Sequence, residues 1–270
     1  MNEFNHVDIR RQEIERSGMG KKLIDLESGP GYLDPGLKVS WAKHHLRALE
    51  KEMREFLNCE ANTVSTEDNL ETGEYILRLH LGNPDATLGL IVGDFVSCLR
   101  GSLDHLVYHL TLAPKGTRND RASFPILGIG DADELRYFTR LVKGVTPKAI
   151  PIIESLQPYH SGNVYKSTKL WRLHRLWNID KHRRIPFHAS KAKMDIRFPA
   201  SMEPVIRRTK DGSEARFPLA AKGDVYFNPS VEFSIHFGDA SEGITIPYEE
   251  LIDIHNFVRN DVMPRFKSFF

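Results

Sequence analysis

The sequence predicts an α+β protein, in which a helical bundle carries a small antiparallel β-sheet inserted before the C-terminal helix. Three observations predict this fold. Up to about residue 186, long segments repeat apolar residues at the spacing of an amphipathic helix. Residues 187–247 instead contain short runs that alternate apolar and polar residues, as antiparallel strands do. Helical spacing returns from residue 248 to the end of the chain.

These changes of pattern divide the chain into four parts. We expect a peripheral N-terminal arm over residues 1–38, where Gly and Pro are frequent, and a helical bundle core over residues 39–186. The antiparallel β insertion is expected over residues 187–247. The C-terminal helix, residues 248–270, is expected to return to the bundle.

The bundle core is expected to contain two long helices before the second polar segment described below. Ser40 is a favourable N-cap for a helix that runs to about Leu57. The helix expected from about Ala86 to Leu112 is apolar on more than one side, which indicates a central position in the bundle. Further elements expected in this part are a short strand at 75–81 and helices at about 132–142, 147–156 and 167–183.

The β insertion contains several short runs that read as strands. The run from Val231 to Phe237 alternates almost perfectly, as a strand with one buried face does. Asp211-Gly212 is a typical hairpin turn. The strands expected are 194–198, 204–207, 215–219, 224–227, 231–237 and 244–246.

The composition is that of a globular protein, with 40% hydrophobic and 27% charged residues among 270. The formal net charge is +1, so any contact with nucleic acid must be local. The two cysteines, Cys59 and Cys98, are too few for a disulfide framework. No apolar run reaches the length of a membrane span, and the N-terminus lacks the apolar core of a signal peptide. We therefore expect a cytoplasmic protein with no membrane partner.

A polar stripe lies on the central helix, where Arg100, Asp104 and His105 stand among apolar residues. Arg100 and His105 flank one broad helix face, and Asp104 can pair with Arg100 one turn away. Histidine can transfer protons, and arginine can stabilise the charge of a phosphorane-like transition state, so this set suits RNA cleavage without a metal. The alternative is a structural network in which the same side chains fix the helix register.

A second polar stripe lies on the helix expected at 167–183. His174, Asn178 and His182 follow one another at intervals of four residues and therefore line one helix face. Lys181 and Arg183 lie near the helix C-terminus, where the helix dipole alone favours cations. The dipole does not explain His174 and Asn178 in the middle of the helix.

The histidine spacing also permits a metal site. His105 and His109 are four residues apart, a spacing that lets two imidazoles share one ion, and His174 or His182 could supply a third ligand. Such a site would hold a divalent transition metal and would act on a small-molecule substrate as a hydrolase or lyase. The alternative is that one histidine of each pair is an ordinary core or surface residue.

The two stripes resemble those of a group of uncharacterised bacterial proteins. These proteins share an Arg-x-x-Leu-Asp-His helix, here residues 100–105, and an Asn-x-Asp-Lys-His-Arg helix end, here residues 178–183. The spacing from Arg100 to His105 also resembles the Arg-His signature of the HEPN superfamily. Members of that superfamily are helical-bundle domains, many of them metal-independent endoribonucleases, in which Arg and His of two protomers meet across a dimer interface. The resemblance implies a HEPN-like bundle, a homodimer, and catalytic roles for Arg100 and His105.

The leading interpretation is therefore a HEPN-like protein that cleaves or binds RNA as a homodimer, with no metal or other cofactor. The alternatives are the metal-dependent hydrolase or lyase and a non-catalytic interaction module. The predicted catalytic residues are Arg100, Asp104, His105, Asn178 and His182. The predicted substrate-binding residues are Tyr108, His174, Lys181 and Arg183.

Overall fold

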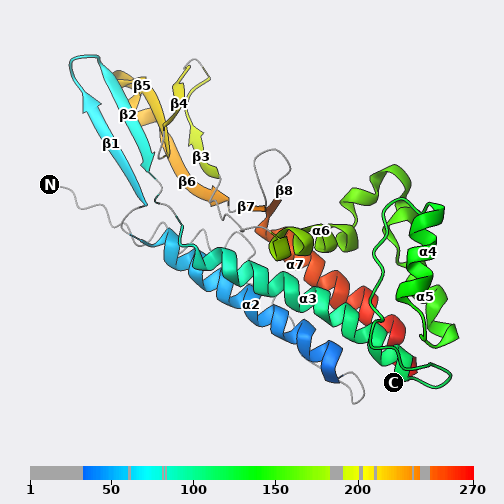
Figure 1. The fold of residues 1–270 in the computed structure, drawn as a ribbon. Helices are drawn as coiled ribbons and strands as arrows, with labels where there is room; N and C mark the ends of the chain where they lie inside the picture. The colour runs from blue at the N-terminus through cyan, green and yellow to red at the C-terminus, as the bar shows by residue number, and fades with distance from the viewer. Residues whose placement is uncertain are drawn as a thin grey trace.

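The computed structural model confirms an α+β fold (Figure 1). The structure describes residues 33–59, 62–80, 82, 84–182, 191–200, 203–209, 212–232, 234–237 and 244–270. Most of the predicted N-terminal arm, residues 1–32, lies outside the described residues, as does Asp211 of the predicted hairpin turn. Helices and strands separate in space: the bundle occupies one end of the molecule, and most of the strands gather at the other (Figure 1).

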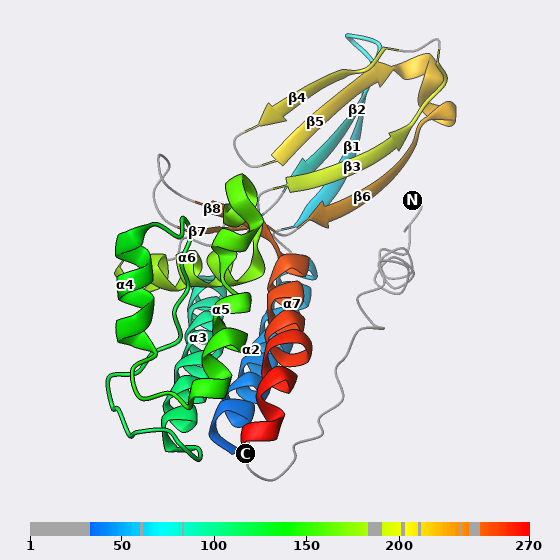
Figure 2. The ribbon, with the colours of Figure 1, turned by 90° about the vertical axis from the view of Figure 1, so that its right-hand side faces the viewer.

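Four helices form the bundle: α2 (Leu33–Leu57), α3 (Thr87–Leu112), α6 (Lys169–His182) and α7 (Tyr248–Phe257). Helix α3 packs against α2 and α6, and α7 packs against the same two helices (Figure 2). Helix α7 continues the chain through a π-helical turn, Val258–Val262, and a 3-10 segment, Met263–Phe269. None of the helices in the described ranges is long and apolar enough to cross a membrane.

Helix α2 begins at Leu33, before the start predicted at Ser40, and ends at Leu57 as predicted. Pro35 lies in its first turn, where the backbone N–H groups have no intrahelical partner and proline is tolerated. The first turns of α2 therefore belong to the bundle and not to a peripheral arm. This earlier start adds Asp34 and Lys38 to the helical surface beside α3.

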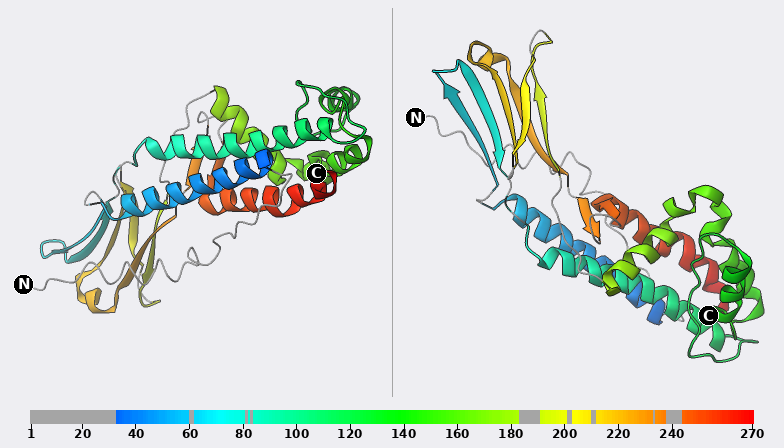
Figure 3. Two further views of the ribbon diagram at one scale, coloured as in Figure 1. Left: turned by 90° about the horizontal axis from the view of Figure 1, so that it is seen from below. Right: turned by 45° about the horizontal axis from the view of Figure 1, so that its top comes forward.

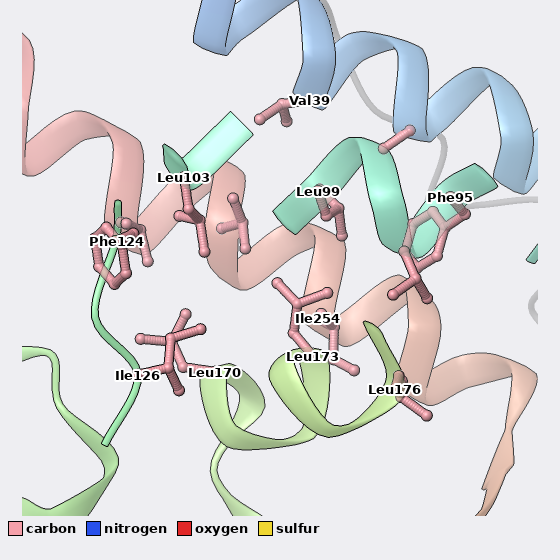
Figure 4. Close-up of a cluster of buried hydrophobic side chains, with 14 of the residues drawn as sticks. Val39, Phe95, Leu99, Leu103, Phe124, Ile126, Leu170, Leu173, Leu176 and Ile254 are labelled. Atoms are coloured by element: carbon pink, nitrogen blue, oxygen red, sulfur yellow. The ribbon is translucent and has the colours of Figure 1, made fainter. Parts of the chain in front are cut away.

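The central position predicted for α3 is confirmed. Its side chains are buried on several sides, and Val92, Leu99 and Leu110 are fully buried. Figure 4 shows the main core, in which side chains from α3, from the segment after it and from α6 and α7 point toward one another. Burial of apolar surface stabilises the fold by about 25 cal/mol per Å². The large apolar surface of α3 therefore holds this helix firmly against its neighbours.

Shorter helices follow α3 and pack against the far end of the bundle. Helix α4 (Ala132–Leu141) is capped by Asp131, whose carboxylate accepts from the Glu134 N–H at 2.8 Å. A 3-10 turn (Pro147–Ala149), α5 (Ile150–Ser155) and a longer 3-10 segment (Pro158–Ser167) lead into α6. The buried side chain of Gln157 accepts from the Leu127 N–H at 3.0 Å, which ties this unit to the segment that follows α3.

The main sheet has the strand order β1-β2-β5-β4, with β1 at Thr63–Asn69, β2 at Glu74–His80, β4 at Val205–Thr209 and β5 at Gly212–Pro218. All neighbouring strands are antiparallel. The sheet is therefore not confined to the region 187–247, because the hairpin between α2 and α3 supplies two of its strands. The prediction contained β2 but not β1, whose sequence is polar and does not alternate.

The described residues form two further strand pairs. Strand β3 (Lys191–Arg197) pairs with β6 (Tyr226–Glu232), and β7 (Ser234–Phe237) pairs with β8 (Ile244–Pro247). A second, smaller core lies on one face of the main sheet, where Leu77 and Phe217 are buried and Ile196 of β3 packs against the cluster. The two views of Figure 3 show this β unit beyond one end of the α2–α3 pair. The pair β7–β8 instead belongs to the bundle, since Ile235 and Ile246 are buried in the main core.

Candidate functional site

The two predicted polar stripes lie on helices α3 and α6, which pack against each other. On the α3 side, Arg100 is buried, with 5% of its surface exposed. Its Nη1 donates to Oδ1 of Asp104 at 2.6 Å, and its Nη2 donates to the Phe124 carbonyl at 2.9 Å and to the Ser123 hydroxyl at 3.3 Å. The guanidinium therefore fastens the 123–124 segment to α3.

The Asp104 carboxylate completes this arrangement. Besides Arg100, its Oδ1 accepts from the Ser123 hydroxyl at 2.6 Å and from the Phe124 N–H at 2.9 Å. One carboxylate oxygen thus serves a cation, a hydroxyl and a backbone amide. Hydrogen bonds to an ionised carboxylate are stronger than those between neutral groups. Asp104 therefore holds both Ser123 and Phe124 in place.

Helix α6 contributes Trp177, His174 and Asn178 to the same place. The Arg100 guanidinium carbon lies 5.4 Å from the centre of the Trp177 ring, within the range of a cation–π contact. Asn178 Nδ2 lies 2.9 Å from His174 Nε2. We call these groups, together with Asp104, Ser123 and the Phe124 backbone, the interhelix network.

The electrostatics of His174 follow from its place in this network. Burial, together with the positive charge of Arg100, lowers the pKa of His174 to about 4, and the Asp104 carboxylate opposes this only in part. The imidazole is therefore neutral at pH 7. Two nitrogens of the network, Arg100 Nε and His174 Nδ1, are buried without a hydrogen-bond partner among the described residues.

Asp180 and Lys181, near the end of α6, lie nearer the surface. The Asp180 carboxylate accepts from the Ser97 hydroxyl at 3.4 Å, and burial raises the pKa of Asp180. Lys181 is exposed, and its ammonium lies 5.0 Å from the centre of the Trp177 ring. Helix α6 ends at His182, whose side chain lies outside what the structure describes, as does the whole of Arg183.

His105 lies on a different side of α3. It is exposed, whereas Arg100 is buried against the 123–124 segment. The charges that act on His105 come from Lys38 and Asp34 of α2 and from His109 and Asp104 of α3. Arg100 and His105 therefore do not meet at one site within this chain. The helix turn between them directs Arg100 inward and His105 toward α2.

Helix α2 places Lys38 beside His105. The Lys38 side chain lies across α3 at Gly101, where an added Cβ would be 3.5 Å from its Cδ and Nζ. Burial, followed by the positive charge of Lys38, lowers the pKa of His105. Asp34 opposes this shift. The exposed imidazole is therefore biased toward its neutral form.

His109 lies one helical turn beyond His105. Its Nε2 is 3.1 Å from Oδ2 of Asp34, and the Tyr108 and Phe270 rings contact its ring edge-on. Side chains four residues apart on a helix have Cβ atoms roughly 5–6 Å from each other, so His105 and His109 are neighbours. We call Asp34, Lys38, His105 and His109 the histidine face.

Among the described side chains, the three histidines proposed as metal ligands do not come together. His174 belongs to the interhelix network, whereas His105 and His109 belong to the histidine face. In the part of the chain that the structure describes, no three His, Cys, Asp or Glu side chains gather closely enough to hold a metal ion. The side chain of His182, the fourth candidate ligand, is not among the described ones.

Sequence reasoning missed two members of the histidine face, Asp34 and Lys38. They were assigned to the peripheral arm because Pro35-Gly36 reads as a loop. Their spacing of four residues, together with the tolerance of a first helical turn for proline, was the signal that could have found them.

Comparison with protein-family models, with curated proteins and with solved structures finds no match to this chain. The resemblance to HEPN domains therefore stays a prediction from one short motif, the spacing of Arg100 and His105. The interpretation of the site depends on the chemistry of the residues described above.

Proposed function

We propose that the protein cleaves RNA without a metal ion, and that the histidine face carries the reaction. The observation that carries this proposal is the pair of exposed His105 and half-buried His109, with Lys38 beside the first imidazole and Asp34 hydrogen-bonded to the second. Two imidazoles and a cation on one accessible surface are the groups that phosphodiester transfer requires.

In the proposed reaction the ribose 2′-oxygen attacks the adjacent phosphorus. His105, biased toward its neutral form, takes the proton from the 2′-hydroxyl as a general base. His109, held by Asp34, gives a proton to the departing 5′-oxygen. The P–O5′ bond breaks as the P–O2′ bond forms, which leaves a 2′,3′-cyclic phosphate and a 5′-hydroxyl. Lys38 stabilises the negative charge of the phosphorane-like transition state.

The interhelix network has a positioning role in this proposal. Both Nη atoms of Arg100 donate to partners in the network, Nη1 to Asp104 and Nη2 to the 123–124 segment, so its charge is already compensated by the carboxylate. Its removal would take the cation from Asp104 and the side-chain donor from the Phe124 carbonyl. Arg100 is thus assigned to fixing α3, with the histidine face on its other side.

The test is cleavage of a single-stranded RNA in excess EDTA, compared with the same RNA carrying 2′-deoxyribose. The wild-type protein is expected to cut only the ribose substrate and to yield 2′,3′-cyclic phosphate ends. His105→Ala is expected to lose about 10²–10⁴-fold in rate, the usual contribution of a general acid or base.

His160→Ala is the matched control, because His160 is also an exposed histidine next to a carboxylate, on a different part of the surface. It is expected to cleave at the wild-type rate. Equal rates for His105→Ala and wild type would refute the proposal, as would cleavage of the 2′-deoxy substrate. Activity that EDTA abolishes would favour the metal-dependent alternative.

A further inference from the structure

An exposed aromatic cluster lies on α2, next to the histidine face. Trp41 exposes 56% of its surface, and the His44 ring stacks on it with a centroid distance of 4.7 Å and an interplanar angle of 13°. His45 meets the Trp41 ring edge-on at 5.9 Å. A large aromatic ring this exposed leaves apolar surface in contact with water. The His44 and His45 rings hold it in a defined orientation.

The position of this cluster relates it to Lys38. Trp41 follows Lys38 by three residues, so the two lie one helical turn apart on the same side of α2. The axial distance is about 4.5 Å at 1.5 Å per residue. A ligand whose phosphate contacts Lys38 therefore has the Trp41 ring within reach of its neighbouring nucleotide.

The chemistry of the cluster matches an unpaired nucleobase. Every base has a flat π-face that stacks on an aromatic side chain, whereas bases in a duplex are already stacked on each other. The Trp41–His44 stack would be extended by one such base, and the cation of Lys38 would bind the backbone beside it. An apolar protein partner would use the ring but not the adjacent cation.

We infer that Trp41 and His44 form a base-stacking subsite that selects single-stranded RNA and presents the adjacent phosphate to the histidine face. This inference rests on the proposed function, since it names the substrate class of the same surface. The stacked base contributes affinity, and the ribose next to it is positioned at His105 and His109.

The experiment measures binding by fluorescence anisotropy in the His105→Ala background, so that the RNA stays intact. The probes are a short single-stranded oligoadenylate, its abasic counterpart with the same backbone, and a duplex of the same length. The starting protein is expected to bind oligoadenylate about 5–150-fold more tightly than the abasic strand, the range for one stacked base. Trp41→Ala is expected to remove this preference, and Trp41→Phe to retain most of it.

Leu37→Ala is the matched control, because Leu37 is 60% exposed and lies one turn away on the same face of α2. It is expected to keep the preference for oligoadenylate. Equal binding of oligoadenylate and the abasic strand by the starting protein would overturn the inference. An equal loss of the preference for oligoadenylate in Trp41→Ala and Leu37→Ala would also overturn it. Trp41-dependent self-association without RNA binding, seen by sedimentation, would assign the cluster to a second copy of the chain instead.

Failure of the inference and failure of the proposed function give different results. If RNA is cut in a His105-dependent manner but binding is insensitive to Trp41, the stacking subsite is wrong and the reaction stands. If Trp41-dependent binding is found but no RNA is cut, the subsite stands and the reaction is wrong.

Discussion

The interhelix network and the histidine face use residues from the same stretch of α3, yet they differ in how far their hydrogen-bonding capacity is used. Arg100 and Asp104 point toward α6 and the 123–124 segment, where protein atoms satisfy most of their polar atoms. His105 and His109 point toward α2 and keep accessible imidazoles. The Arg100–His105 motif thus contains two kinds of residue. Arg100 and Asp104 fix the structure, whereas His105 is accessible to a substrate.

A polar stripe on an apolar helix can therefore serve structure on one side and chemistry on the other. Burial makes a polar group costly unless it is paired, and most polar atoms of the inward members have partners, with Arg100 Nε and His174 Nδ1 as exceptions among the described residues. The outward members are not under that constraint. Variants of the network should therefore change stability, and variants of the histidine face should change activity.

The largest effect on stability is expected for Asp104→Ala. It removes the acceptor of three hydrogen bonds and leaves the Arg100 charge buried without its carboxylate, which costs about 3 kcal/mol of unfolding free energy. Urea denaturation measures this loss. Asp120→Ala, which breaks an exposed pair with Arg118, is the control and should cost less than about 0.5 kcal/mol. Similar small losses in both variants would contradict the account of the network.

The pH dependence of stability should reveal His174. The folded protein keeps this imidazole neutral down to about pH 4, whereas the unfolded chain protonates it near its ordinary pKa of 6.5. The unfolded state then binds more protons between these values, so stability falls as the pH drops from 6.5 toward 4. Between pH 6.5 and 4, the unfolding free energy of His174→Gln should therefore fall less than that of wild type. The difference should be about 2–3 kcal/mol, since the ring is not fully buried.

Chemical denaturation at a series of pH values measures this difference. His160→Gln, a change at an exposed histidine, is the control and should follow the wild-type curve. Parallel curves for wild type and His174→Gln would show that the network does not hold the imidazole neutral.

A smaller effect is expected for Lys38→Met, which keeps the aliphatic stem across Gly101 and removes the charge. RNA cleavage should slow roughly tenfold, since one charge-stabilising contact to the phosphate is lost. The slope of log binding constant against log salt should also become shallower by about 0.7, the value for one phosphate contact on a single strand. Lys51→Met, at an exposed lysine further along α2, should leave both quantities unchanged.

The smallest effect is expected for Asp34→Asn. The amide still reaches the His109 ring but no longer supplies a negative charge, so cleavage should fall by about 3–10-fold, within the range of an exposed charged hydrogen bond. Single-turnover cleavage measures the change. Stability should be unaffected, because Asp34 is exposed. A loss of stability with unchanged cleavage would move Asp34 from the reaction to the packing of α2.

Much of the fold could be predicted because periodicity is a local signal. Helix α3 was expected from about Ala86 and begins at Thr87, since its apolar residues repeat along its whole length. Strand β1 could not be predicted, because the run Thr63–Asn69 is polar and is held by pairing with β2. The pairing of β2 with β5 joins segments far apart in the chain, and no local pattern specifies such a partner.

The site was predictable only in part for a similar reason. The spacing placed Arg100 one turn from Asp104, and His174 one turn from Asn178, and each pair is in contact in the structure. It did not indicate whether the two stripes face each other. The partners of Arg100 include the Phe124 carbonyl, a backbone group that every residue carries and that no sequence pattern marks. The separation of Arg100 from His105 depends on which neighbours cover each side of α3, and this is decided by tertiary packing.

The most direct test of the account is single-turnover cleavage of single-stranded RNA in EDTA by wild type, His105→Gln and His174→Gln, at a pH of about 7 where all three are folded. We expect His105→Gln to lose at least about 100-fold in rate and His174→Gln to stay within about threefold of wild type, since His174 belongs to the structural side. The opposite pattern, with His174→Gln inactive and His105→Gln active, would place the reaction in the interhelix network and contradict the division proposed here.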